Sequence, residues 1–113
     1  MNTAIHQGGE DAGFRHRPAD ARLFAHPRLE IVAEIARRPG VSFRNLCEDL
    51  GLSDGNLSAH LRALEEAGAM RVERTFDGRR RLSQYHLTDE GRKRLRDYVD
   101  WLGRFAQSMR RIV

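Results

Sequence analysis

The sequence predicts a mainly helical fold of the α+β class, in which three short helices precede a β-hairpin and a long C-terminal helix. Apolar residues recur at three- and four-residue spacing over residues 27–68 and again over 89–112, as amphipathic helices require. Between these stretches, residues 70–87 alternate apolar and polar side chains around Asp77-Gly78, a dipeptide typical of a tight reversal between two strands. The chain of 113 residues has room for one small domain.

The first predicted helix begins at Pro27, because proline is favoured in the first turn of a helix. It ends before Pro39-Gly40, a pair that does not continue a helix. A turn over residues 20–25 precedes it and is expected to add Leu23 and Phe24 to the core.

The next two predicted helices are short and closely spaced. Ser42 is a good N-cap for the second helix, and Gly51 supplies the left-handed residue that ends it. Ser53 caps the third helix, residues 54–67, which stops at Gly68. Two short amphipathic helices joined by about three residues form the helix-turn-helix pattern.

The hairpin carries a concentration of positive charge. Its loop is expected to hold Arg79, Arg80 and Arg81, which places a basic wing over residues 76–82. Residues 70–96 contain nine basic residues against four acidic ones, a surplus of five, whereas the whole chain has a formal net charge of +4. Three helices and a basic two-stranded hairpin describe a winged helix-turn-helix, and the clustered charge favours a polyanionic partner.

The third helix presents a face suited to double-stranded DNA. With its leucines toward the core, the opposite face combines small residues, which let the backbone approach a groove about 12 Å wide, with side chains that can hydrogen-bond to base edges. The alternative for the third helix is an ordinary solvated face that binds nothing. The alternative for the hairpin tip is a solvated charged loop. His60 lies at the edge of the apolar face and is expected to pack rather than to contact bases. The candidate DNA-binding residues are Ser53, Gly55, Asn56, Ser58, Ala59 and Arg62 on the helix and Arg79, Arg80 and Arg81 on the wing.

The last predicted helix begins at Thr88 and runs toward Ile112. Its apolar residues follow alternating steps of three and four, the heptad spacing of a helix–helix seam. We expect this seam to form a homodimer, because a small core cannot cover a helix about 36 Å long. The alternative is that the helix folds back on the first helix and on residues 20–26. The seam consists of Leu95, Tyr98, Leu102, Phe105, Met109 and Ile112.

Several other classes of protein are disfavoured. The longest apolar run is three residues, so we expect no membrane-spanning segment, and the N-terminus has no apolar stretch typical of a secretory signal. The single cysteine, Cys47, allows neither an internal disulfide nor a multi-thiolate metal site. No set of residues in a catalytic context is recognisable. We therefore expect a cytoplasmic, nucleoid-associated protein that is not an enzyme and uses no metal or cofactor.

Several stretches of the chain resemble small stand-alone winged-helix transcriptional regulators related to the MarR and ArsR families. They are Val41–Leu46 (VSFRNL), Leu50–Leu61 (LGLSDGNLSAHL), Leu64–Gly68 (LEEAG), Phe76–Arg80 (FDGRR) and Tyr85–Arg92 (YHLTDEGR). The resemblance covers about residues 23–102. It implies a dimeric DNA-binding repressor whose recognition helix is 54–67 and whose wing is 76–82. Metal-sensing ArsR relatives carry a Cys-x-Cys pair where Ser42 and Arg44 stand here, so the resemblance implies no thiolate metal site.

These expectations divide the chain into a disordered tail (1–19), a winged-helix DNA-binding domain (20–88) and a C-terminal dimerisation helix (89–113). The predicted function is sequence-specific binding of double-stranded DNA by a dimeric transcriptional repressor that reads an inverted repeat. The alternatives are a winged-helix protein-interaction module and a ligand-gated sensor. The sequence identifies neither the operator nor an effector.

Overall fold

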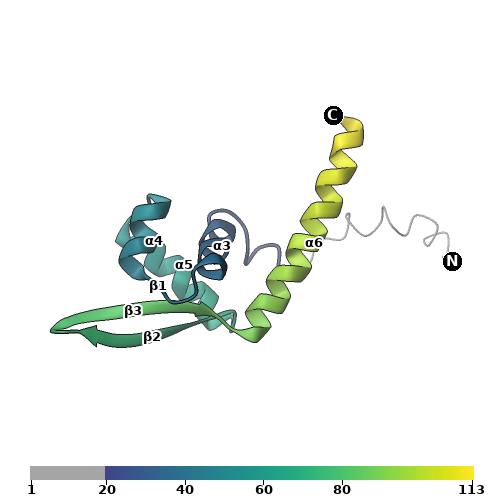
Figure 1. Ribbon diagram of the computed structural model, residues 1–113. Coiled ribbons are helices and arrows are strands. Elements are labelled where there is room, and N and C mark those ends of the chain that lie inside the picture. The colour runs from purple at the N-terminus through teal and green to yellow at the C-terminus, as the bar shows by residue number, and fades with distance from the viewer. Residues whose placement is uncertain (1–19) are drawn as a thin grey trace.

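The computed structural model describes residues 20–113, and the predicted disordered tail lies outside the described residues. The described part is a mainly helical winged helix, as predicted (Figure 1). Its elements are α3 (Arg28–Arg37), β1 (Val41–Ser42), α4 (Phe43–Leu50), α5 (Asp54–Glu66), β2 (Met70–Asp77), β3 (Arg80–Leu87) and α6 (Asp89–Ile112).

The predicted helix boundaries are confirmed by the caps. The hydroxyl oxygens of Ser42, Ser53 and Thr88 each accept a hydrogen bond from the backbone amide three residues later, so each satisfies one amide that the first turn leaves open. Gly51 ends α4 in the left-handed conformation, with a φ of 65°. One detail differs, because Pro27 is the N-cap of α3 and lies just outside the helix.

The described residues form a three-stranded antiparallel sheet in the order β1-β3-β2, where the sequence predicted only the hairpin. The added strand β1 pairs through Val41 with Tyr85. It escaped prediction because two residues are too few to show an alternating pattern.

The prediction that Arg79, Arg80 and Arg81 share a loop was wrong for two of the three. Arg80 and Arg81 belong to β3, where they lie opposite Asp77 and Phe76 in the register. The turn is short because Gly78 adopts a φ of 68°, so the two strands stay paired almost to the tip.

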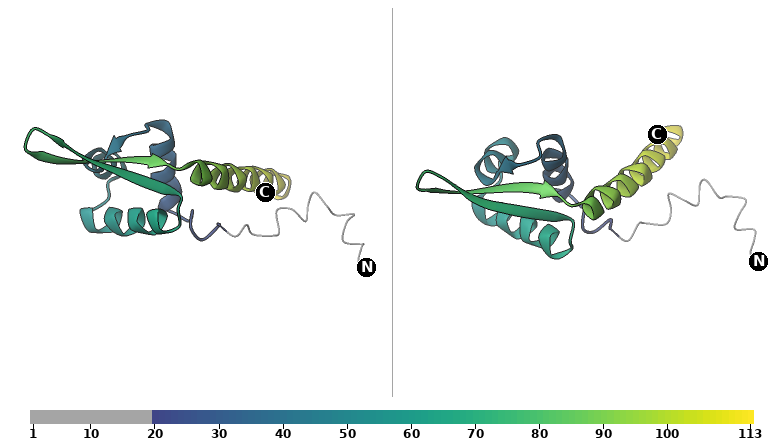
Figure 2. Two further views of the ribbon diagram at one scale, coloured as in Figure 1. Left: turned by 90° about the horizontal axis from the view of Figure 1, so that it is seen from below. Right: turned by 60° about the horizontal axis from the view of Figure 1, so that its bottom comes forward.

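The core lies where α3, α4 and α5 meet one end of the sheet. Leu57 and Leu64 of α5 are fully buried and Leu61 almost so, as predicted. Phe24, from the turn before α3, is also buried and contributes to the core as expected. From this body the tip of the β2–β3 hairpin projects past α4, and α6 leaves in another direction (Figures 1 and 2).

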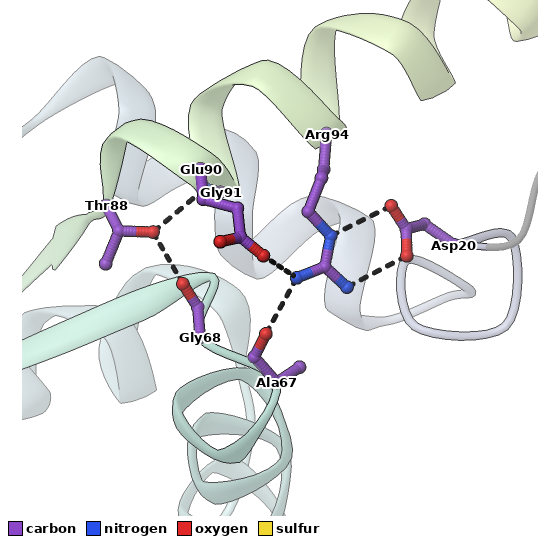
Figure 3. Close-up of polar contacts among 7 residues, drawn as sticks. All are labelled: Asp20, Ala67, Gly68, Thr88, Glu90, Gly91 and Arg94. Atoms are coloured by element: carbon purple, nitrogen blue, oxygen red, sulfur yellow. Dashed lines mark hydrogen bonds and ion pairs between the residues drawn. The ribbon is translucent and has the colours of Figure 1, made fainter.

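The start of α6 is fixed to the turn that follows α5 (Figure 3). The Thr88 amide donates to the Ala69 carbonyl at 3.1 Å, and the Thr88 hydroxyl donates to the Gly68 carbonyl at 2.6 Å. The Gly91 backbone lies so close to Ala69 that a Cβ atom at position 91 would stand 1.9 Å from the Ala69 carbonyl oxygen. The first turn of α6 therefore packs directly on the turn that follows α5.

A single arginine ties three segments together one turn later (Figure 3). Arg94 donates through Nε and Nη2 to both carboxylate oxygens of Asp20, at 3.0 and 2.9 Å. Its Nη1 donates to the Ala67 carbonyl at 2.7 Å and to Glu90 Oε2 at 3.1 Å. Arg94 thus joins α6 to the end of α5 and to the segment before α3, and the bidentate geometry makes this a strong ion pair.

Replacing Asp20 by Asn is expected to destabilise the protein by about 1–2 kcal/mol at pH 7, because two charge-assisted hydrogen bonds are weakened at a partly buried site. The hydrogen bonds from Arg94 lower the pKa of Asp20 in the folded state. The stabilisation is therefore present above the ordinary pKa and is lost as the pH falls below about 4. Urea unfolding of the wild type and of Asp20→Asn should show a difference in unfolding free energy that becomes smaller as the pH falls below about 4.

The control for this experiment is Asp97→Asn. Asp97 pairs with Lys93 at 3.2 Å, but both side chains are more than half exposed. Such a pair contributes less than about 1 kcal/mol. If Asp20→Asn and Asp97→Asn lost the same unfolding free energy at pH 7, the expected contribution of the Asp20–Arg94 pair to stability would be wrong.

No helix among residues 20–113 is long and apolar enough to cross a membrane.

Candidate nucleic-acid interface

The predicted DNA-facing residues of the third helix lie together on one exposed face of α5. The leucines at positions 57, 61 and 64 point into the core, and the helical period turns the remaining positions outward. Nothing lies within 4 Å of the place where a Cβ atom of Gly55 would stand, so this end of the face is open. The exposed residues are Gly55, Asn56, Ser58, Ala59 and Arg62.

Ser53 stands at the N-terminal edge of this face and is also exposed. Its Oγ accepts a hydrogen bond from the Asn56 amide at 3.2 Å, so the side chain is engaged as the helix cap. Its hydroxyl hydrogen remains available for an outside acceptor.

His60 borders the same face and is held from within the protein. Arg28 of α3 donates through Nε to His60 Nδ1 at 3.1 Å. Burial, and then the charge of Arg28, hold the pKa of His60 below its usual range. The imidazole is therefore neutral at pH 7 and anchors α5 to α3.

The two faces of the hairpin differ in charge near the tip. Side chains alternate along a strand, and directly paired residues share a face. One face carries Arg74, Phe76 and Arg81, while Asp77 and Arg80 lie on the other. Arg79 occupies the turn, and all of these side chains are exposed.

A groove of about 400 Å³ lies between the start of α4 and the hairpin. Arg44 contributes to its wall together with Arg80 and Arg81. Three arginines and Asp77 thus line one concave surface beside the wing.

The candidate residues did not include Arg44 or Arg74, and Phe76 entered only as the first residue of the predicted wing. Arg74 and Phe76 share the hairpin face of Met70 and Val72, but Arg74 breaks the apolar alternation, so the predicted strand ended before them. Arg44 has no comparable signal, because its place beside the wing depends on the pairing of β1 with β3.

The six residues of the predicted seam divide into two groups. Leu95, Tyr98 and Leu102 pack against the protein's own core, where the ring of Tyr98 lies 5.6 Å from that of Phe24. The contact between Tyr98 and Phe24 matches the part of the alternative in which the helix folds back on residues 20–26. The other part, packing on the first helix, stays a prediction.

The other seam residues lie farther out along α6 and are not part of the core cluster. Phe105 is 40% exposed and Ile112 is 73% exposed, with the partly buried Met109 between them. Phe105 stacks on Trp101 with 5.5 Å between ring centroids, so the aromatic stack continues outward from the core. The far half of α6 therefore presents an apolar stripe on a helix that extends beyond the body (Figure 1).

A capped helix with an exposed polar face, next to an arginine-bearing hairpin, defines a winged-helix DNA-binding protein. The comparison with known families agrees with the geometry. The chain belongs to the winged helix DNA-binding domain family, whose model matches residues 28–106.

Known relatives support the same assignment. An uncharacterized protein of Methanocaldococcus jannaschii is 32% identical over 72 residues, which are 64% of this chain and 78% of that protein. A transcriptional regulator homologue from Pyrococcus horikoshii OT3 has the same fold, with a TM-score of 0.75 at 22% identity over 89% of this chain and 97% of the other. MarR matches with a TM-score of 0.71 at 22% identity, covering 93% of this chain and 80% of its own.

A further match is the transcriptional repressor CouR bound to a 23-mer DNA duplex. Its TM-score is 0.66 at 25% identity, over 88% of this chain and 69% of CouR. The predicted resemblance to MarR-type regulators is confirmed. The family is one of winged-helix DNA-binding domains, and the fold is shared with solved transcriptional regulators.

Among residues 20–113, no group of three or more His, Cys, Asp and Glu side chains is placed to hold a metal ion.

Proposed function

We propose that this protein is a dimeric transcriptional repressor that binds an inverted repeat in double-stranded DNA. The observation that supports the proposal most strongly is that the exposed polar face of α5 and the arginine-bearing hairpin belong to one body. Only residues 67–69 separate α5 from β2, so the helix and the wing are positioned together. A body of this shape can place α5 in the major groove while the wing contacts the flanking backbone or minor groove.

The residues of α5 divide by chemistry into two roles. Asn56 and Arg62 can form bidentate hydrogen bonds to base edges, and Ser58 adds a hydroxyl. Gly55 and Ala59 have no long side chains, so they allow the helix backbone to approach the groove. Ser53, at the start of the helix, is suited to a phosphate contact.

The wing arginines are suited to contacts that do not depend on base identity. Arg79, Arg80 and Arg81 are exposed at the tip, where guanidinium groups reach phosphates or enter a narrow minor groove. This part of the interface supplies affinity, and α5 supplies discrimination between sequences.

Dimerisation is supported by the far half of α6. Phe105 is 40% exposed and Ile112 is 73% exposed, although apolar side chains gathered on one helix face usually cover a partner surface. A second copy related by a two-fold axis would cover this stripe with the same stripe. It would also present two α5 helices to the two halves of an inverted repeat.

The test is a gel-shift titration on a duplex selected from a random pool by the wild-type protein. Replacing Arg79, Arg80 and Arg81 together by Ala is expected to weaken binding to every duplex and to lower the slope of log affinity against log salt by about 2–3. Replacing Asn56 or Arg62 by Ala is expected to cost about 1–3 kcal/mol on the selected duplex and much less on random DNA.

Arg37→Ala is the control, because Arg37 is an exposed arginine in the last turn of α3, where it pairs with Glu34. It should leave both affinity and salt slope nearly unchanged. Equal losses on selected and random duplexes for the Asn56 and Arg62 variants would contradict base reading by α5. A folded wild-type protein that shifts no duplex at low salt would contradict the whole proposal and favour a protein-interaction module.

A further inference from the structure

Phe76 is an exposed aromatic residue at the tip of the wing. Phe76 is 69% exposed, although removing a phenylalanine side chain from water is favourable. The hairpin tip projects past α4 and away from the helical body (Figure 1), and Phe76 is not among the residues packed on the core. The described part of the chain therefore gives this ring no apolar environment.

The surroundings of Phe76 are basic. Arg81 lies directly opposite it in the β2–β3 register, and Arg74 precedes it by two residues on the same face. The carboxylates of Glu73 and Asp77 lie on the other face of the hairpin, because side chains alternate along the strand. The register thus places Phe76 between two arginines, and Asp77, its neighbour in sequence, lines the groove that Arg81 also lines.

An apolar ring flanked by positive charges is suited to a binding partner that has negative charges around a less polar groove. The DNA minor groove has this character, since charged phosphates line its edges while sugars and base edges form its walls and floor. Proteins that enter it combine arginines with apolar wedges, which part a base step and bend the duplex.

We propose that Phe76 inserts into the minor groove of bound duplex DNA as an apolar wedge, while Arg74 and Arg81 pair with phosphates on either side. The inference rests on the proposed function and deepens it. The wing then acts on DNA shape, and favours sites with an easily deformed pyrimidine–purine step under the hairpin.

The experiment uses full-length protein and a duplex selected by the wild type, labelled at both ends so that energy transfer reports bending. Phe76→Ser is expected to weaken binding about tenfold and to reduce the bend, because the wedge is lost. The slope of log affinity against log salt should stay unchanged, because Phe76 displaces no counterions. Arg81→Ala should instead lower that slope by about 1.

Two further variants separate a wedge from a structural role. Phe76→Leu keeps an apolar side chain and is expected to retain most of the affinity and bend. Thr75→Ala changes the exposed neighbour on the opposite face and should alter neither property. Thermal unfolding of Phe76→Ser should match the wild type, since substitutions of exposed side chains usually change stability little.

The outcomes distinguish this inference from the proposed function. If Phe76→Ser kept the affinity and the DNA bend of the wild type, the proposed insertion of Phe76 would be wrong. The proposal that the protein is a DNA-binding regulator would be unaffected. A salt slope lowered by Phe76→Ser would also overturn the proposed insertion, because the change would then act through the arginines. A wild-type protein that selects no duplex would overturn both proposals.

Discussion

Replacing Gly91 by Ala is expected to destabilise the winged helix by about 3 kcal/mol or more, one of the largest effects of a single methyl group in this chain. The added Cβ would stand 1.9 Å from the carbonyl oxygen and 2.6 Å from the carbonyl carbon of Ala69. Both are backbone atoms, so no side chain can rotate away. The same carbonyl accepts the Thr88 amide, so α6 can move aside only by breaking that hydrogen bond.

The measurement is thermal or urea unfolding at one fixed protein concentration, with Gly103→Ala as the matched control. Gly103 lies in the same helix with nothing within 4 Å of its added Cβ. Alanine there should stabilise α6 by about 0.5–1 kcal/mol, because glycine is a poor helix former. Gly91→Ala should lower the melting temperature by about 10 °C or more, given about 4–8 °C per kcal/mol for a domain of this size. Two variants that both gain stability would contradict the close approach at Ala69.

The contrast between Gly91 and Gly103 shows that sequence patterns predict local structure but not contacts between distant segments. The three capping residues, Ser42, Ser53 and Thr88, were predictable because a cap depends on neighbours within one turn. The burial of the α5 leucines followed from their helical spacing. Gly91 carries no such local signal, because its importance depends on where the end of α5 lies relative to α6.

Contacts between distant segments were missed for the same reason. Arg94 and Asp20 are 74 positions apart in the chain, so no local sequence spacing predicts that they form an ion pair. Within the candidate interface, the exposed face of α5 was predictable in full. The wing was placed correctly, but its strands run farther than expected, because exposed polar strands lack the apolar alternation that marks buried ones.

The C-terminal seam shows a different difficulty. Heptad spacing identifies a stripe of apolar residues but not the surface that covers each one. In the structure, Phe24 covers Tyr98, whereas Ile112 is largely exposed. The same heptad spacing therefore includes residues of the core and residues on the surface. The outer residues are therefore the ones to change in a test of dimerisation.

Replacing Phe105 and Ile112 together by Glu is expected to convert the proposed dimer to a monomer at micromolar concentration. Two carboxylates from each copy would have to be buried in the seam, at several kcal/mol for each unpaired charge. The winged-helix body should remain folded, because neither residue belongs to the core cluster. Sedimentation equilibrium measures the mass, and circular dichroism checks the fold.

The same variant should bind an inverted repeat at least about 100-fold more weakly than the wild type, because a monomer loses the effective concentration that links two half-sites. Its affinity for a single half-site should change much less. Gln107→Glu with Arg104→Gln is the matched control, since it also lowers the net charge by two but lies on the exposed polar side of α6. If this control lost as much affinity as the seam variant, the effect would be electrostatic. A wild-type protein that sediments as a monomer, yet binds the repeat tightly, would show that the two α5 helices are not held together by α6.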